Sequence, residues 1–286
     1  MAIVPFVAGR QLNSSGTVLE VIHLSDTHFG PDHSHDIRGA NACDRACTLV
    51  KAINELPFDP DFIVHTGDVV NDPDEGAYAL AQEILSELKA PVYYVTGNHD
   101  DVPMMRAALD FADHELLVPE SDDQLCYRIK SAAEDFEFFV MDGKVPEEEG
   151  PHGYLSDNQV EAVLSQISGE KPIAVFLHYP LTPIGSKWID KHLLVSNGEA
   201  FHDALAEKAG SQLRGIFTGH LHRGLQLYKN GVLQSGVSSP ACEFSAGPHD
   251  DFCDFLPGGP IPFNHISFTA DSTMVKSYSL PFPGDS

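Results

Sequence analysis

The chain has 286 residues, enough for one large α/β domain or two small ones. Hydrophobic residues make up 42% of it and charged residues 21%, which is ordinary for a globular protein with a sizeable core. With 17 basic and 42 acidic residues, the formal net charge is −25. A surface of this sign repels other polyanions, so nucleic-acid polymers and anionic membranes are excluded as preferred partners.

No stretch of the sequence predicts export or a membrane span. The first ten residues lack a basic region followed by a long apolar run, and no apolar run approaches the roughly 20 residues that a spanning helix needs. The five cysteines have no framework spacing, which suits a reducing compartment, so we expect a cytoplasmic protein. Cys43 and Cys47 lie one helical turn apart beside an apolar face, and we expect both to pack in the core.

The first hundred residues alternate between predicted strands and helices. Buried strands are expected at Thr17–Ser25, Asp61–Thr66 and Pro91–Thr96, and amphipathic helices at Ala42–Leu56 and Ala77–Leu88. This order is typical of parallel strands joined by right-handed crossovers.

The alternation of parallel strands and helices does not continue after this point. A helix is expected at Val102–His114, followed by two antiparallel strands at Gln124–Lys130 and Asp135–Asp142 and a loop from Gly143 to Gly153. Capping boxes predict helices that begin at Ser156 and Ser196, and between them lie a strand at Pro172–Leu177 and a long loop with Trp188. The last expected elements are a strand at Leu213–Thr218 and a hairpin of Asn264–Ala270 with Thr273–Leu280. Without repeats or a linker, residues 1–286 are expected to form a single domain.

Polar residues follow five of the predicted strands at the point where each strand ends. They are Asp26 and His28, Asp68, the run Asn98-His99-Asp100, His178, and His220 with His222. Open α/β folds place their ligands at this edge of the sheet, so we expect these side chains to converge. Any one of them is explained as a turn residue or a buried histidine, but their joint occurrence favours a metal site.

The ordered motifs D-x-H, G-D, G-N-H-D, H and G-H-x-H resemble those of the calcineurin-like metallophosphoesterase family. The resemblance extends over most of the chain and weakens after about residue 245. It implies a four-layer α-β-β-α sandwich with two mixed sheets and a metal site at the strand ends. It also implies two metal ions, about 3.5–4 Å apart in sites of this kind. Seven residues would hold them: Asp26, His28 and His222 the first ion, Asn98, His178 and His220 the second, and Asp68 both.

The chemistry of such a pair follows from the ligand types. Imidazole ligands favour Mn, Fe, Zn or Co over Mg and Ca, and a water between two such ions becomes hydroxide near neutral pH. This hydroxide would attack phosphorus in line with the leaving oxygen. The resemblance places His99 where it can protonate the leaving alkoxide or stabilise the transition state, and Asp100 where it orients His99 or a metal ligand. Asn98 and His99 would also contact the substrate.

The segment after His178 indicates which phosphoester is cleaved. From His178 to His192 it resembles bacterial class III cyclic-nucleotide phosphodiesterases and their glycerophosphodiesterase relatives. This implies a small phosphodiester such as 3′,5′-cyclic AMP, with Trp188 either stacked on a base or packed within its own loop. Tyr179 departs from the pattern, since many relatives carry a second histidine there.

Two other functions stay open. One is a broad-specificity phosphodiesterase acting on glycerophosphodiesters or 2′,3′-cyclic nucleotides, and the other is a non-catalytic interaction scaffold with the same fold. Residues 244–286 would either cap the pocket or form a dimer contact, so a homo-oligomer is among the expectations.

Overall fold

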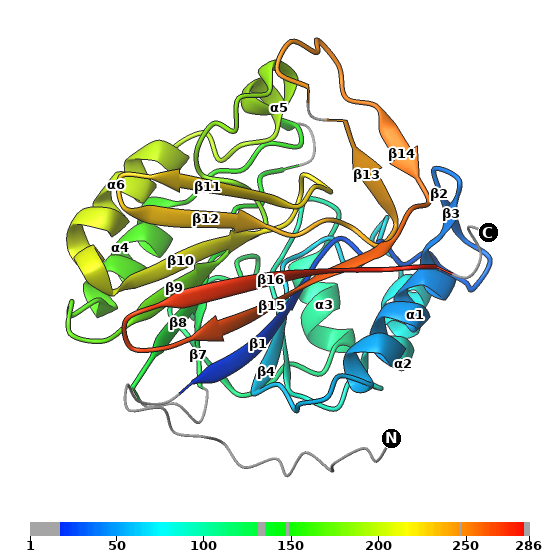
Figure 1. Ribbon diagram of the computed structural model, residues 1–286, viewed down its shortest axis with the longest axis horizontal. Coiled ribbons are helices and arrows are strands. Elements are labelled where there is room, and N and C mark those ends of the chain that lie inside the picture. The colour runs from blue at the N-terminus through cyan, green and yellow to red at the C-terminus, as the bar shows by residue number, and fades with distance from the viewer. Residues whose placement is uncertain (1–17, 131–134, 147–148, 246, 283–286) are drawn as a thin grey trace, which may run out of the picture.

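The computed structural model describes residues 18–130, 135–146, 149–245 and 247–282 (Figure 1). Thr17, and the N-terminal segment on which the location was predicted, lie outside the described residues. The strands are β1 (Leu19–Leu24), β2 (Asp36–Ile37), β3 (Ala40–Asn41), β4 (Phe62–His65), β5 (Val92–Tyr94), β6 (His114–Leu116), β7 (Tyr127–Ile129), β8 (Glu137–Val140), β9 (Ile173–Phe176), β10 (Leu213–Thr218), β11 (Leu225–Lys229), β12 (Val232–Gly236), β13 (Cys242–Phe244), β14 (Phe255–Pro257), β15 (Ile261–Phe268) and β16 (Thr273–Leu280). The α-helices are α1 (Ala42–Asn54), α2 (Glu75–Leu85), α3 (Val102–Ala108), α4 (Asp157–Gln166), α5 (Lys187–His192) and α6 (Gly198–Ala209), the last followed by a 3-10 turn, Gly210–Gln212.

Two mixed sheets form the centre of the fold. The first has the strand order β16-β15-β1-β4-β5, with β1, β4 and β5 parallel and β15 and β16 antiparallel to their neighbours. The second has the order β11-β12-β10-β9-β8-β7-β6, parallel from β12 to β8 and antiparallel at both ends. The expected parallel strands, the antiparallel pair β7–β8 and the hairpin β15–β16 are thereby confirmed.

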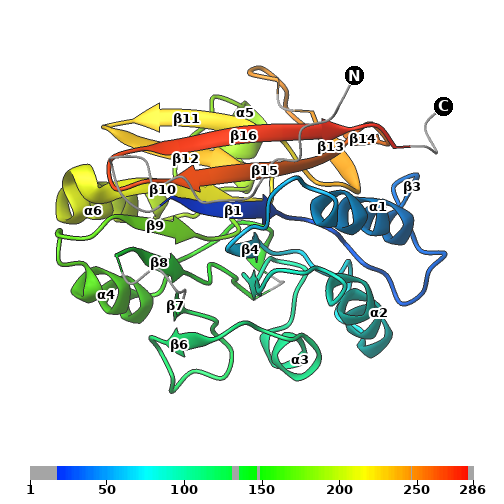
Figure 2. The same ribbon diagram turned by 60° about the horizontal axis from the view of Figure 1, so that its bottom comes forward.

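Side chains alternate along the strands between separate apolar layers. In β1, Val21 faces a core shared by the two sheets, while Ile22 faces a core formed with α1 and α2. In β9, Phe176 faces the shared core and Val175 faces the core beneath α4 and α6. Figure 2 shows α1, α2 and α3 on one side of the molecule and α4 and α6 on the opposite side. The expected four-layer α-β-β-α sandwich is confirmed.

Phenylalanine rings fill the layer between the two sheets. Phe138 of the second sheet lies 5.2 Å from Phe62 and 5.4 Å from Phe268 of the first sheet, measured between ring centroids. Phe217 lies 5.3 Å from Phe176 and 5.6 Å from Phe268. Aromatic pairs at these separations add to the stability that burial supplies. The sheets are thus packed so that the C-terminal ends of β1, β4, β5, β9 and β10 meet along one rim.

Two expected elements, a helix and a loop, differ from the structure. The helix predicted over Val102–His114 ends at Ala108, because Leu109 adopts an extended conformation (φ −96°, ψ 141°). His114 instead begins β6, which pairs with β7 at the edge of the second sheet, so pairing overrides helix propensity there. Trp188, expected in a long loop, lies in the short helix α5.

One of the two predicted capping boxes forms its cap. The Ser156 side chain accepts the backbone N–H of Gln159 at the start of α4, as expected. The prediction at Ser196 is wrong, because α6 begins after Asn197, whose side chain bonds the backbone N–H and C=O of Leu155 instead. A tertiary contact has therefore replaced the local cap.

The two cysteines of α1 do not share an environment. Cys43 is 3% exposed and packs in the core under α1, as predicted. Cys47 is exposed, so the prediction that it packs in the core is wrong. Four residues advance roughly 40° beyond one full turn, so Cys47 lies at the border of the buried face, where it is exposed.

Candidate metal centre

The strand ends carry an unusual backbone. Five of the seven candidate ligands have a positive φ, in the left-handed region that L-residues rarely adopt: Asp26 (56°), His28 (50°), Asp68 (53°), His220 (66°) and His222 (45°). Such conformations cost energy and persist where the surrounding structure enforces them, which is common at functional sites. The chain therefore turns sharply directly after β1, β4 and β10 and directs these side chains to a common place.

Glycines allow the turns to approach one another. A Cβ atom at Gly97 would lie 2.1 Å from Asp68 Oδ1, and one at Gly219 would lie 1.9 Å from Ser25 Oγ and 2.6 Å from Asp26 Oδ2. A side chain at either position would collide with a neighbouring strand end. The glycine that precedes Asn98 and His220 in the motifs is thus explained by close packing.

Four residues supply the first group of candidate ligand atoms: Asp26, His28, Asp68 and His222, all buried, with one ligand atom from each within 4.8 Å of the others. His28 Nε2 and His222 Nε2 are 2.9 Å apart. Asp26 Oδ1 lies 3.3 Å from His222 Nε2, and Asp68 Oδ2 lies 3.7 Å from His28 Nε2. Two carboxylates and two imidazoles thus converge on one point.

The second group consists of Asp68, His178 and His220, again buried and within 4.8 Å of one another. His178 Nε2 lies 3.3 Å from Asp68 Oδ2 and 3.3 Å from Asn98 Oδ1, so Asn98 joins this group. Asp68 belongs to both groups. The structure therefore brings together all seven residues that the sequence motifs singled out.

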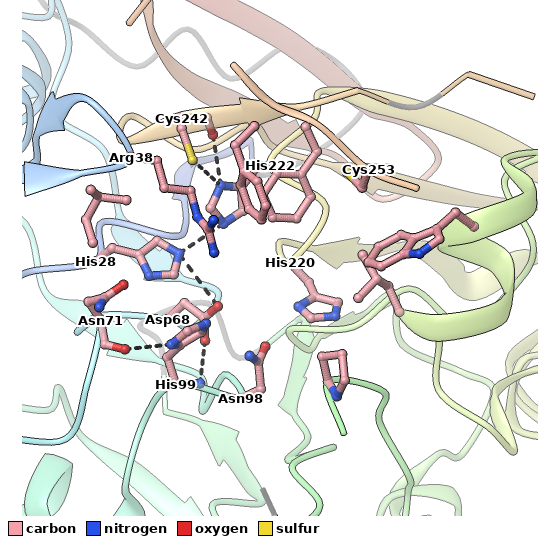
Figure 3. A pocket seen from close by; sticks show the side chains of 16 residues that line it. His28, Arg38, Asp68, Asn71, Asn98, His99, His220, His222, Cys242 and Cys253 are labelled. Carbon is pink, nitrogen blue, oxygen red and sulfur yellow. Dashed lines mark hydrogen bonds and ion pairs between the residues drawn. The ribbon is translucent and has the colours of Figure 1, made fainter. Parts of the chain in front are cut away.

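Backbone carbonyl groups fix the orientation of three imidazoles. His178 Nδ1 is 2.7 Å from the carbonyl oxygen of Thr66, His222 Nδ1 is 2.8 Å from that of Cys242, and His99 Nδ1 is 2.6 Å from that of Asn71. A carbonyl oxygen only accepts, so each Nδ1 carries the proton and donates it. Each Nε2 is then available to face the site, an arrangement found around metal-ligating histidines. Figure 3 shows this for His99 and His222.

Acidic partners set the charge of two of these histidines. Burial disfavours a charged ring, yet the Asp26 carboxylate raises the pKa of His222 to about 10 and the Asp68 carboxylate raises that of His178 to about 9. Burial would likewise raise the pKa of Asp26 and Asp68, but His222 and His178 hold both below the usual range. Without metal, the site contains two ion pairs.

The other two imidazoles are neutral. Burial lowers the pKa of His220 to about 3, with the nearby His178 adding to the effect, and burial lowers the pKa of His28 well below its usual value. A neutral imidazole has a lone pair to offer, so His28 and His220 are in the form that a metal ligand requires.

The donor set fits a metal pair. Nε2 of His220 is buried and has no hydrogen-bond partner among the described residues. Buried polar atoms without a partner are rare, and a cation supplies one. Carboxylate oxygens together with imidazole nitrogens suit transition metals. The protein thus has a buried Asp/His cluster suitable for a dinuclear metal site.

His99 and Asp100 differ in what they contact. The His99 ring lies 5.0 Å from the His28 ring at the edge of the site, and its backbone N–H donates to Asp68 Oδ1 at 2.9 Å. The carbonyl of Asn71, not Asp100, orients the His99 ring, so of the two roles expected for Asp100 the orientation of a metal ligand stays a prediction. The Asp100 carboxylate instead accepts the backbone N–H groups of three residues: Gly97, Val69 and Val70. It ties the turn after β4 to the turn after β5.

A cavity of about 250 Å³ opens above the metal ligands. Trp188 is among the residues that line it. Phe244 and Phe255 of β13 and β14 also line it, within the segment for which a pocket cap was one of two expectations, whereas Arg38, another lining residue, was not among the predicted site residues. One signal for Arg38 was present, because Arg38-Gly39 between short alternating segments is a two-residue turn of the kind found in hairpins.

Comparison with known sequences defines the class of protein that carries this site. The sequence model of the calcineurin-like phosphoesterase family matches residues 19–224, which is more than half of the chain. The chain belongs to this family and is a metal-dependent hydrolase.

Curated bacterial proteins show what members with similar sequences do. The chain is 33% identical over 211 residues to the glycerophosphodiester phosphodiesterase GpdQ of Enterobacter lignolyticus, covering 70% of this chain and 69% of that protein. It is 28% identical over 235 residues to the 3′,5′-cyclic adenosine monophosphate phosphodiesterase CpdA of Haemophilus influenzae, covering 79% of this chain and 78% of that protein. Both relatives are phosphodiesterases by name.

Solved structures at lower identity share the fold. A purple acid phosphatase from yellow lupin superimposes with a TM-score of 0.60 at 13% identity over 92% of this chain, which spans 52% of that larger protein. GAP50 of Plasmodium, an anchor in the inner membrane complex, superimposes with a TM-score of 0.56 at 15% identity. The match covers 92% of this chain and 84% of the GAP50 chain. Within the described part of this chain, none of the helices has the length and apolar character needed to span a membrane.

Proposed function

We propose that the protein hydrolyses small phosphodiesters, in the first place 3′,5′-cyclic nucleotides such as cyclic AMP. The observation that carries this proposal is a single cavity lined both by metal-ligand candidates and by the aromatic side chains Trp188, Phe244 and Phe255. An aromatic wall beside a phosphate-binding centre suits an ester with a planar organic group. The cyclic AMP phosphodiesterases of Haemophilus influenzae and Escherichia coli, 28% and 27% identical, support the same substrate class.

The proposed metal ligands are the seven residues of the strand ends: Asp26, His28 and His222 for one ion, Asn98, His178 and His220 for the other, and Asp68 for both. The two ions would lower the pKa of water towards neutrality and polarise the phosphoryl oxygens. Nitrogen and oxygen donors in this mixture favour Mn, Fe, Zn or Co. Asp68 accepts the His99 backbone N–H at its other oxygen, which holds the shared carboxylate in place.

His99 is the proposed proton donor to the leaving alkoxide. Its Nδ1–H is donated to the Asn71 carbonyl, so Nε2 is the atom that exchanges a proton at the cavity. The ring donates from Nε2 in its imidazolium form. Asn98, which also lines the cavity, is proposed to contact the phosphoryl group as well as the metal.

A broader specificity is the second candidate. The relative named as a glycerophosphodiester phosphodiesterase has the higher identity of the two described above, 33%, and its name points to a different diester. A non-catalytic scaffold fits less well, because the ligand set and His99 converge on one cavity.

A specificity profile separates these functions. The Mn-loaded protein is assayed with four substrates: 3′,5′-cyclic AMP, 2′,3′-cyclic AMP, a chromogenic diester and a chromogenic monoester. A kcat/KM for 3′,5′-cyclic AMP well above the other three supports the first proposal. Similar values for all diesters favour the broad enzyme, and hydrolysis of none of the four contradicts both.

A cytoplasmic location and a single domain over residues 1–286 complete the proposal. All five cysteines are free thiols, and Cys43, Cys126 and Cys242 are buried, which suits a reducing compartment. Cell fractionation with the tagged full chain tests the location, and a single thermal transition tests the domain count.

A further inference from the structure

A short hairpin brings one charged residue to the rim of the cavity. β2 and β3 pair with Ile37 opposite Ala40, so the turn between them is the dipeptide Arg38-Gly39. Both residues have positive φ, 51° and 96°, which defines a type I′ turn. Asn and Gly are the usual residues of such turns, and an arginine at the first position is strained. A strained residue at the edge of an active site points to a role there.

Two contacts hold the hairpin against β13 and β14. Ile37 is 6% exposed and packs in an apolar cluster with Ala241 and Cys242. At the tip, the position that a Cβ of Gly39 would occupy is 3.3 Å from Pro257. The turn is therefore fixed relative to the aromatic wall of the cavity.

The guanidinium of Arg38 is positioned by the same wall. Its Cζ lies 3.3 Å from the centroid of the Phe255 ring, in a cation–π arrangement. Phe255 meets Phe244 edge-on at 4.8 Å, and Phe244 stacks on the metal-ligand candidate His222 at 4.1 Å and 15°. A continuous series of rings thus joins Arg38 to the metal centre, and Figure 3 shows the Arg38 side chain directed into the cavity.

Charge makes Arg38 distinct among its neighbours. Of the described residues that line the cavity, it alone is a lysine or arginine, on a chain of net charge −25. Within the described part of the chain, its N–H groups have no hydrogen-bond acceptor and no carboxylate partner. Stacking occupies the face of the guanidinium and leaves its edge of N–H donors open to the cavity.

We propose that Arg38 is a substrate-binding residue that recruits and holds the anionic phosphodiester through its non-bridging oxygens. This inference rests on the proposed function, since it assigns a role to Arg38 in the same cavity. Guanidinium and phosphate form paired, charge-assisted hydrogen bonds. A permanent cation at the mouth also offsets the acidic surface that an incoming anion meets.

The test is the Arg38→Gln variant, assayed with 3′,5′-cyclic AMP and with bis(p-nitrophenyl) phosphate. KM is expected to rise roughly tenfold or more for both substrates, the size of a lost charge-assisted hydrogen bond, while kcat changes less than about twofold. The difference from the wild type should shrink at high salt. Phe255→Leu removes the supporting ring and should raise KM less than Arg38→Gln does. Arg106→Gln on α3, outside the cavity lining, is the control and should leave both KM and kcat unchanged.

A second readout keeps the two proposals separable. Inhibition by inorganic phosphate is measurable with whichever ester the enzyme cleaves, and Arg38→Gln should raise the inhibition constant as well. If the wild type prefers monoesters, the proposed function fails while this measurement still decides the role of Arg38. Unchanged KM and inhibition constants would overturn the inference, as would a KM increase confined to cyclic AMP, which would make Arg38 a contact for the base. Melting temperature and metal content of the variants should match the wild type.

Discussion

At the scale of single residues, the site is defined by where each imidazole keeps its proton. His178 and His222 donate Nδ1–H to backbone carbonyls and face Asp68 and Asp26 with Nε2. The same Nε2 atoms are the candidate metal donors. A proton and a metal ion therefore compete for one atom in each ring.

This competition predicts how metal affinity depends on pH. In the metal-free protein the pKa of His178 is about 9 and that of His222 about 10, so both rings are protonated at pH 7, whereas Asp26 and Asp68 are already ionised. Binding of Mn²⁺ at pH 7 should release about two protons, and affinity should rise from pH 6 to pH 9. Calorimetry in buffers of different ionisation enthalpy measures the protons released. A release of none would contradict these charge states.

A second prediction at this scale concerns His99. His99→Ala should lower kcat by roughly 10²–10⁴, the usual loss for a general acid, and should retain the metal, because its ring belongs to neither ligand group. Metal content by mass spectrometry and kcat on the preferred diester are measured together. A variant with unchanged kcat would rule out proton donation by His99, and one that loses metal would make it a ligand.

At the scale of elements, the turns after the strands decide whether the ligands meet. The turns after β1 and β10 pass so closely that a Cβ at Gly219 would lie 2.6 Å from Asp26 Oδ2. The backbone N–H of His220 donates to this same oxygen at 3.1 Å. Any shift of one turn therefore displaces a carboxylate on the other.

The Gly219→Ala variant tests this packing. It should destabilise the protein by about 1–3 kcal/mol, as overpacking does, and should weaken metal binding because Asp26 must move. Gly224→Ala is the matched control, since a Cβ at Gly224 would have no atom within 4 Å. Thermal melting and Mn²⁺ titration of both variants give the comparison. Equal behaviour of the two would show that the turns tolerate displacement.

The sequence predicts an element where neighbouring residues determine its structure, and fails where contacts with distant residues determine it. The strands ending at Asp26, Asp68 and His178 were predictable, because a buried run and the polar residue after it are adjacent in the chain. The end of α3 and the start of α6 were not, because pairing of β6 and a contact with Leu155 decide them. Site residues split in the same way. The metal-ligand candidates follow strands that are almost entirely buried and read as apolar runs, whereas Phe244 and Phe255 lie on short strands that are largely exposed or half-buried and give no such signal.

At the scale of the whole molecule, the layer between the sheets determines whether the two halves of the site face each other. Asp26 and Asp68 come from the first sheet, and His178 and His220 from the second. The apolar layer that joins these sheets consists of the phenylalanine rings together with valine, leucine, isoleucine and tyrosine side chains. Stability of this layer and integrity of the metal site should therefore change together.

Phe138→Ala tests the contribution of that layer. Phe138 is fully buried and away from the cavity, and its loss should cost about 3–5 kcal/mol of unfolding free energy. The control is Phe252→Ala, since Phe252 is 61% exposed and its removal should have little effect. Chemical denaturation of the two metal-free variants gives both values. A cost below about 1 kcal/mol for Phe138→Ala would mean that the sheets do not depend on this packing.

The proposed hydrolysis depends on two metal ions that share Asp68. The most direct test is the metal content per chain of the reconstituted wild type and of Asp68→Ala, with Asp122→Ala, an exposed carboxylate, as the matched control. We expect two ions in the wild type and in Asp122→Ala, and loss of both in Asp68→Ala, because that carboxylate belongs to both ligand groups. A wild type that binds a single ion, or an Asp68→Ala variant with unchanged content, would contradict it.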